Sequence, residues 1–193
     1  MTEMTETQNE AAPAPRALTR RQLEKLIVNR NARFDALSPA ERRMAIARDV
    51  LAQLKKGRLV ARADIYVNTM PGSTISVVGD AQEVADNPGL RCTVCAIGSA
   101  VVSAVGLFDQ VPEFASLHDL AEQHYRYAYL SLFFSEEQQA LMEAAFEMKL
   151  IGLASSSTPG VFRAIAFGQR YDTDDKRLRA IWRNVLRNGE FIP

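Results

Sequence analysis

The sequence predicts a mainly α fold, α+β at most, arranged around a buried central helix at residues 92–108. Three observations predict this class. The central stretch, CTVCAIGSAVVSAVGLF, has no charged residue, and its apolar side chains recur at steps of three and four residues. Other stretches with the same spacing follow recognisable helix-capping signals. Only residues 58–78 show the two-residue alternation of strands, which predicts one small β-hairpin there.

Composition bounds the class of protein further. The chain has 193 residues, 47% of them hydrophobic, and its 23 basic residues balance 23 acidic ones. This predicts a single globular α-rich domain over 18–193, without a general charge-based affinity for nucleic acid or an anionic membrane. Residues 1–17 are polar, acidic and proline-containing, which predicts a disordered tail. Two cysteines and no visible export signal favour the cytoplasm, and no stretch predicts a membrane span.

Two helices are predicted before the hairpin. The first runs from a cap at Thr19 to about Phe34, with apolar residues on one side. The second has the clearest signal in the chain, because Ser38-Pro39-Ala40-Glu41 combines a serine cap, a proline in the first turn and a capping-box glutamate. We expect this helix to end at Lys56, with Gly57 as its stop. The hairpin strands that follow are joined through the turn at 70–73.

The remaining helices follow the central one. An aromatic-rich helix is predicted at 116–134, and Ser135 caps a helix at 136–149 in which Gln138 closes the capping box and Leu150 faces inward. Residues 152–170 are interpreted as a loop with a short apolar interlude. The last helix is predicted at 174–188, after a cap at Asp172 or Thr173 and before a glycine stop.

Three of these stretches resemble a known group of proteins. PAERRMAIARDVLAQLKKG (39–57), FFSEEQQALMEAAFE (133–147) and RLRAIWRNVLRNGEFIP (177–193) are similar to small uncharacterised proteins of bacteriophages and bacterial genomes. The resemblance covers most of the chain after residue 38 and favours a phage or prophage origin. It implies no activity and no site residues.

The cysteines and histidines form the first candidate site. Cys92, Cys95, His118 and His124 are the only such residues in the chain, in the pattern C-x2-C-x22-H-x5-H. Two thiolates and two imidazoles satisfy tetrahedral zinc, although the six-residue histidine spacing places the two on different sides of one helix.

Two other chemistries and a structural role remain open for the same residues. Cys95, at a helix start that lowers a thiol pKa, is a candidate nucleophile with His118 or His124 as its base. A dithiol redox pair is a further alternative, but it requires a preceding strand, which the sequence does not indicate. We favour the interpretation that the cysteines are small apolar core residues.

Basic residues form the second candidate site. Arg20, Arg21 and Lys25 lie on the first helix beside the flexible tail, and a single stripe on the last helix carries Lys176, Arg179, Arg183 and Arg187. Such stripes can follow phosphates, or can be the solvent-facing side of amphipathic helices.

The sequence thus supports three functional hypotheses. The first is a non-catalytic protein that binds a protein partner through a helical surface, either the first helix or the aromatic helix. The second is a thiol- or zinc-dependent enzyme that uses Cys92, Cys95, His118 and His124. The third is a nucleic-acid-binding protein that uses the basic helices.

Overall fold

The computed structural model describes residues 20–69, 91–108, 129–150 and 159–193. In these residues the fold is mainly helical with a small three-stranded sheet, which confirms the predicted class. The helices are α1 (Arg20–Ala36), α2 (Pro39–Lys55), α4 (Ala96–Phe108), α6 (Glu136–Glu147), α7 (Pro159–Gly168) and α8 (Asp174–Asn188), and the strands are β1 (Leu59–Ala61), β2 (Val67–Thr69) and β3 (Cys92–Val94). The predicted tail at 1–17 and most of the predicted helix at 116–134 lie outside the described residues.

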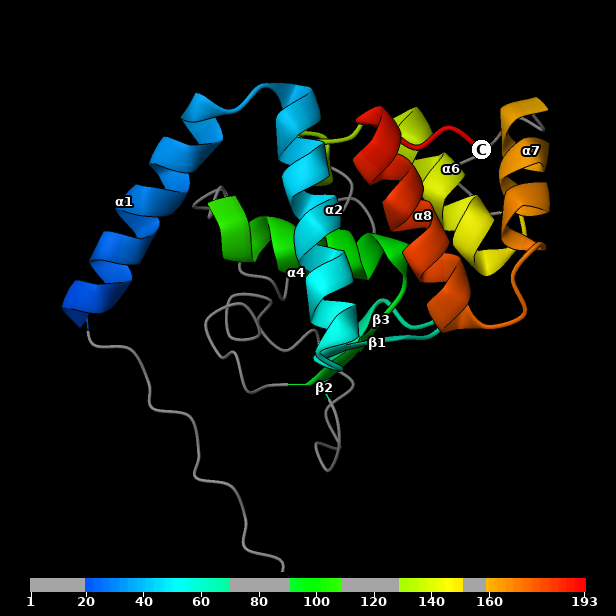
Figure 1. The fold of residues 1–193 in the computed structure, drawn as a ribbon, viewed down its shortest axis with the longest axis horizontal. Coiled ribbons are helices and arrows are strands. Elements are labelled where there is room, and N and C mark those ends of the chain that lie inside the picture. Colours follow the sequence, from blue (N-terminus) through cyan, green and yellow to red (C-terminus); the bar gives the residue numbers. More distant parts are fainter. Residues whose placement is uncertain (1–19, 70–90, 109–128, 151–158) are drawn as a thin grey trace, which may run out of the picture.

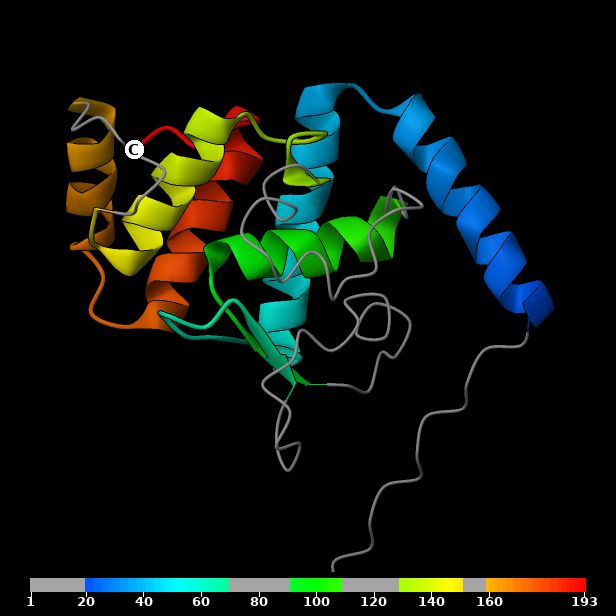
Figure 2. The same cartoon turned by 180° about the vertical axis from the view of Figure 1, so that it is seen from behind.

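The helices form two layers. Figure 1 shows α2 and α8 side by side, with α4 passing behind α2 and α6 lying behind α8. Figure 2 shows α4 and α6 in front when the molecule is turned round. The sheet lies at the lower end of α2, α7 packs against α6, and α1 lies at the opposite side of the molecule from α7.

The central helix is buried as predicted, but it is shorter. Within α4 every residue from Ala96 to Val105, and also Phe108, is buried. The indole of Trp182 donates to the hydroxyl of Ser99 at 3.0 Å, and Ser99 donates to the carbonyl of Ala96 at 2.7 Å, which satisfies the polar groups inside this apolar surrounding. Residues 92–94 are a strand rather than the first helical turn, because strands on both sides hydrogen-bond to them.

The sheet also differs from the predicted hairpin. β1 and β2 both lie before the predicted turn at 70–73, within the stretch interpreted as the first hairpin strand, and they do not pair with each other. The predicted turn and the second predicted strand lie outside the described residues. The strand order is β1-β3-β2, in which β1 is parallel to β3 and β2 is antiparallel to it. A strand from a distant part of the chain therefore occupies the centre of the sheet, and local alternation cannot indicate such pairing.

Close approach of backbones fixes the sheet against α4. A side chain at Gly98 would place its Cβ 1.7 Å from the carbonyl oxygen of Tyr66, so only glycine allows this contact. The same carbonyl accepts a hydrogen bond from the backbone of Cys95 at 3.2 Å. The connection between β1 and β2 is thereby held against the start of the central helix.

Capping explains where the other helices begin. The Ser38–Glu41 capping box and the cap at Thr173 are present as predicted. Ser135 caps α6, but the Gln138 side chain bonds to the backbone of Phe191 instead of closing a box, and Leu150 is 55% exposed rather than inward.

The segment interpreted as a loop contains α7. Pro159 occupies the first turn, where its missing N–H costs no hydrogen bond. The buried residues Val161, Ala164, Phe167 and Gly168 then follow at helical spacing. A Pro-Gly dipeptide is typical of turns, which is why the sequence favoured a loop here. That interpretation was wrong for 159–168, because this dipeptide begins a helix.

Candidate functional site

The two cysteines lie at the junction of the sheet and the central helix. Cys92 belongs to β3, and Cys95 is the residue before α4; both are buried and both are free thiols. The expectation that both cysteines lie at the helix start is correct only for Cys95. The strand that a redox pair requires is present, although Cys92 lies inside this strand and does not follow it.

Cys95 acts as the N-terminal cap of α4. Its sulfur accepts a hydrogen bond from the backbone N–H of Gly98 at 3.4 Å, in the position that a serine hydroxyl occupies at other caps. Burial nevertheless raises the pKa of the Cys95 thiol to about 12, opposed by the hydrogen bond from Gly98 and assisted by the carboxylates of Glu143 and Glu147. Burial likewise raises the pKa of Cys92 to about 11. This environment keeps both thiols protonated at neutral pH, which is the reverse of what activates a nucleophile.

The predicted partners of these thiols are not described. His118 and His124 lie within 109–128, outside the described residues, so the predicted convergence of Cys92, Cys95, His118 and His124 stays a prediction. Among the residues that the structure describes, no group of three or more His, Cys, Asp or Glu side chains is arranged to hold a metal.

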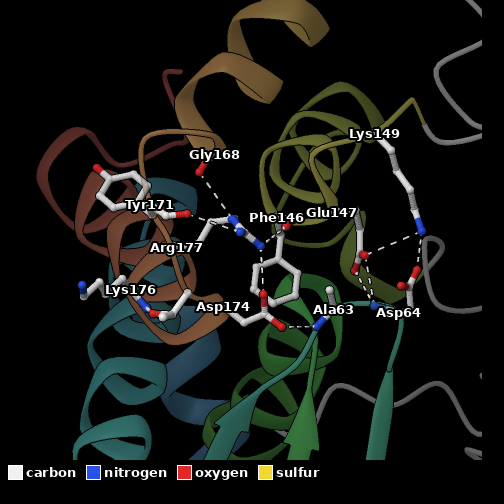
Figure 3. Close-up of polar contacts among 11 residues, drawn as sticks. Ala63, Asp64, Phe146, Glu147, Lys149, Gly168, Tyr171, Asp174, Lys176 and Arg177 are labelled. Carbon is white, nitrogen blue, oxygen red and sulfur yellow. Dashed lines mark hydrogen bonds and ion pairs between the residues drawn. The ribbon is translucent and has the colours of Figure 1, made fainter.

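A polar cluster joins the ends of α6 and α7, the start of α8 and the connection between β1 and β2 (Figure 3). At its centre is Arg177, which is 3% exposed. Its guanidinium donates to the carbonyls of Phe146 at 2.9 Å and of Gly168 and Tyr171 at 3.4 Å each, and pairs with Asp174 at 3.0 Å. A single cation thus satisfies the carbonyl ends of α6 and α7 from the first turn of α8.

Asp174, the acid that pairs with Arg177, also holds the connection between β1 and β2. Asp174 accepts from the backbone N–H of Ala63 at 2.8 Å. The next residue, Asp64, has a left-handed backbone with φ 62°, and its N–H donates to the Glu147 carboxylate at 3.0 and 3.2 Å. Lys149 pairs with Asp64 and lies 3.9 Å from Glu147.

Two residues of this cluster have a perturbed acidity: the hydrogen bond with Asp64 raises the pKa of Lys149, and the pKa of Glu147 is also raised. The side chain of Glu147 is 7% exposed, and burial raises its pKa, opposed by the hydrogen bond from Asp64. A carboxyl group with a raised pKa beside a lysine is a common feature of catalytic sites, but it also occurs in structural networks. Here both carboxylate oxygens of Glu147 accept from the backbone amide of Asp64. These contacts hold the connection between β1 and β2 in place and do not indicate a substrate.

The amino-acid sequence alone does not indicate this cluster. Arg177 lies among several basic residues of α8, and its i,i+3 spacing from Asp174 is the only local signal of the pair. Its burial depends on the ends of α6 and α7, which are distant in sequence.

The predicted basic residues are placed on two separate helices. On α1, Arg21 and Lys25 are exposed, whereas the side chain of Arg20 is not described. On α8, Lys176 pairs with Asp172 at 2.9 Å and Arg179 with Asp175 at 2.7 Å, while Arg183 and Arg187 are exposed. The predicted stripe is therefore partly neutralised.

A comparison with known protein families, with curated proteins and with solved structures finds no match for this chain. The resemblance to bacteriophage and bacterial proteins stays a prediction. None of the described helices has the length and apolar character that crossing a membrane requires.

Proposed function

We propose that this protein acts by binding a protein partner, and that the outward face of α1 is the surface it uses. The observation that carries the proposal is the mixed character of this face. Arg21, Lys25 and Val28 follow at steps of four and three residues, which places them on one side of the helix. All three are exposed, and Val28 keeps 66% of its surface in solvent.

The C-terminal end of α1 is fixed to the body of the molecule. The ring of Phe34 packs edge-to-face on Phe108 and Phe133, with ring centroids 5.9 and 5.8 Å apart. The guanidinium of Arg42 lies 3.6 Å from the centre of the Phe34 ring and donates to the Phe34 carbonyl at 2.9 Å. Because the helix is held at this end, its outward face is presented in one orientation, which lowers the entropy cost of binding.

The chemistry of the face favours a protein over nucleic acid. A phosphate backbone makes no use of an exposed valine beside two cations, whereas protein interfaces combine apolar and basic contacts. The chain carries no net charge. The second basic region predicted for nucleic acid, on α8, has two of its four cations paired with aspartates.

The test compares the complete chain with a K25E/V28E variant in cells of the source organism. Chemical crosslinking and quantitative affinity enrichment identify proteins that accompany the chain, and each candidate is then purified and its binding measured directly. We expect one partner whose affinity falls at least about tenfold in the variant, because both a cation and an apolar contact are lost.

The matched control is R163E on α7, which changes an exposed charge at a distance from α1 and should leave binding unchanged. Equal binding by K25E/V28E and the natural chain would contradict the proposal. A shift of duplex DNA or RNA at low salt that depends on Arg21 and Lys25 would replace the protein partner with nucleic acid.

A further inference from the structure

A second surface lies on the outer side of the α2–α8 pair, which faces away from α4 and α6 (Figures 1 and 2). Two contacts fix these helices as antiparallel. Arg179 donates to the carbonyl of Leu54 at 3.0 Å, and a Cβ added at Gly189 would lie 3.4 Å from that of Ala40. This register places Met44 of α2 opposite Leu186 of α8.

The floor between the two helices is apolar. Met44, Leu51 and Leu186 are partly buried, and helical periodicity places all three along the outward seam of the pair. Leu51 and Leu186 pack against the core from this side. We call these three partly exposed side chains along the seam the apolar strip. A helix face that is only solvated carries polar residues at such positions.

Both rims of this strip are basic. Arg48 and Lys55 lie on the α2 side, Arg183 and Arg187 lie on the α8 side, and all four are exposed. In the described part of the chain no carboxylate pairs with any of the four.

The nearby acids are already engaged by other groups. Glu41 closes the Ser38 capping box, and Asp49 accepts from Gln53. Asp175 pairs with Arg179. Hydrogen bonds do not remove the charges of Glu41 and Asp49, but the four rim cations outnumber these two acids and Glu190 together. The rims of the strip therefore keep a net positive charge.

We propose that this strip, the α2–α8 face, binds an amphipathic acidic helix of a partner protein. Apolar residues of such a helix at i, i+3/i+4 and i+7 would cover Met44, Leu51 and Leu186, and its flanking carboxylates would reach the arginines on the rims. Arginine suits this role because its planar fork pairs with both oxygens of a carboxylate. The apolar floor favours a peptide over a phosphate backbone. The surface is separate from the outward face of α1, and the inference stands independently of the function proposed there.

The probe is a fluorescein-labelled synthetic peptide of about five helical turns, with leucine on one face and glutamate on both flanks. Fluorescence anisotropy measures its binding to the complete chain at low and at physiological salt. We expect binding that weakens with salt and falls at least about tenfold in R48E/R183E, because two attractive pairs become repulsive. M44S, which removes part of the floor, should weaken binding with little change in salt dependence.

The matched control is R62E/R163E, which makes the same change in net charge at two exposed positions outside the strip. It should bind the peptide as the natural chain does, apart from a small uniform loss. Circular dichroism checks that all variants are folded.

Three results would overturn the proposal. One is that R48E/R183E binds the peptide as tightly as the natural chain does. Another is a dissociation constant above about 1 mM for the peptide and the natural chain. The third is binding of a duplex oligonucleotide that depends on Arg48 and Arg183 when the peptide does not bind, which would assign the face to nucleic acid. Variants at Arg21 or Lys25 test only the function proposed for α1. Their result does not affect this experiment, because none of its variants lies on α1.

Discussion

The side chain of Arg177 connects several elements of the fold. From α8 it closes the carbonyl ends of α6 and α7, and through Asp174 it holds the β1–β2 connection. We expect R177A to destabilise the protein by about 3 kcal/mol, because Asp174 and several buried carbonyls lose their partner. Urea unfolding monitored by the fluorescence of Trp182 measures the change.

The matched control is R183A, on the same helix but exposed and without a described partner. Its effect should lie within about 0.5 kcal/mol. Equal effects of the two variants would show that the contacts of Arg177 do not contribute to stability.

The thiols make a second prediction at this scale. Because burial raises the pKa of Cys92 to about 11 and of Cys95 to about 12, both should react with iodoacetamide at pH 8 only as fast as the protein opens. Mass spectrometry of the native and the urea-unfolded chain compares the rates, and we expect a native rate at least about a hundredfold lower. Rapid native labelling of Cys95 would instead favour the nucleophile hypothesis.

Glu147 gives stability a dependence on pH. Its pKa is raised in the folded protein, so the folded state binds this proton more tightly than the unfolded chain does. Its contribution is fully present below the ordinary glutamate pKa of 4.5 and is lost as the pH rises through the folded value.

The variant E147Q should remove this dependence. As the pH rises from 4.5, the natural chain should lose stability relative to E147Q, which urea midpoints measured over this range will show. A constant difference between the two proteins across the range would mean that Glu147 does not titrate differently in the folded state.

At the scale of elements, the last residues of the chain are held by side chains of α6 and α8. The Gln138 amide accepts from the N–H of Phe191 at 2.8 Å and donates to its carbonyl at 3.1 Å. Asn184 makes the same pair of bonds with Ile192. The ring of Phe191 is 1% exposed and packs edge-to-face on Phe167.

We expect Q138A to lower the free energy of unfolding by about 1–3 kcal/mol, because the part-buried backbone of Phe191 loses both of its bonds. Q169A, at an exposed position after α7, is the control and should have almost no effect. If the two variants are equally stable, water replaces the Gln138 amide without cost.

Elements with local signals were predictable and those with distant partners were not. Ser38, Glu41 and Thr173 act on their own helices, so the starts of α2 and α8 follow from the sequence. β3 exists only because β1 and β2 lie on either side of it, and Cys92–Val94 alone resembles the beginning of an apolar helix. Gln138 has the residue type of a capping box but finds a better partner in Phe191.

At the scale of the whole molecule, the same limit applies to the candidate site. The burial of the cysteines was predictable from the uncharged stretch around them. The acids that raise the pKa of Cys95 come from α6, about 50 residues later in the chain. The carbonyls that bind Arg177 come from α6, α7 and the turn between α7 and α8. No spacing in the sequence indicates that these groups meet.

The layered arrangement predicts unequal stability across the molecule. Nearly every residue of α4 is buried, and the helix packs against α1, α2 and α6, so its amides should exchange with deuterium only through global unfolding. α1 is attached through Phe34 and the guanidinium of Arg42. R42A removes a cation–π contact and a hydrogen bond, together worth about 1–2 kcal/mol, so exchange in residues 20–33 should become about tenfold faster. Exchange in residues 96–108 should change little in R42A. The control is R48A, at an exposed position of α2 on a different side of the helix, and it should leave exchange in both regions unchanged. If exchange in α4 accelerates as much as in α1, the two helices open together, and α1 is part of the cooperative core rather than a projecting arm.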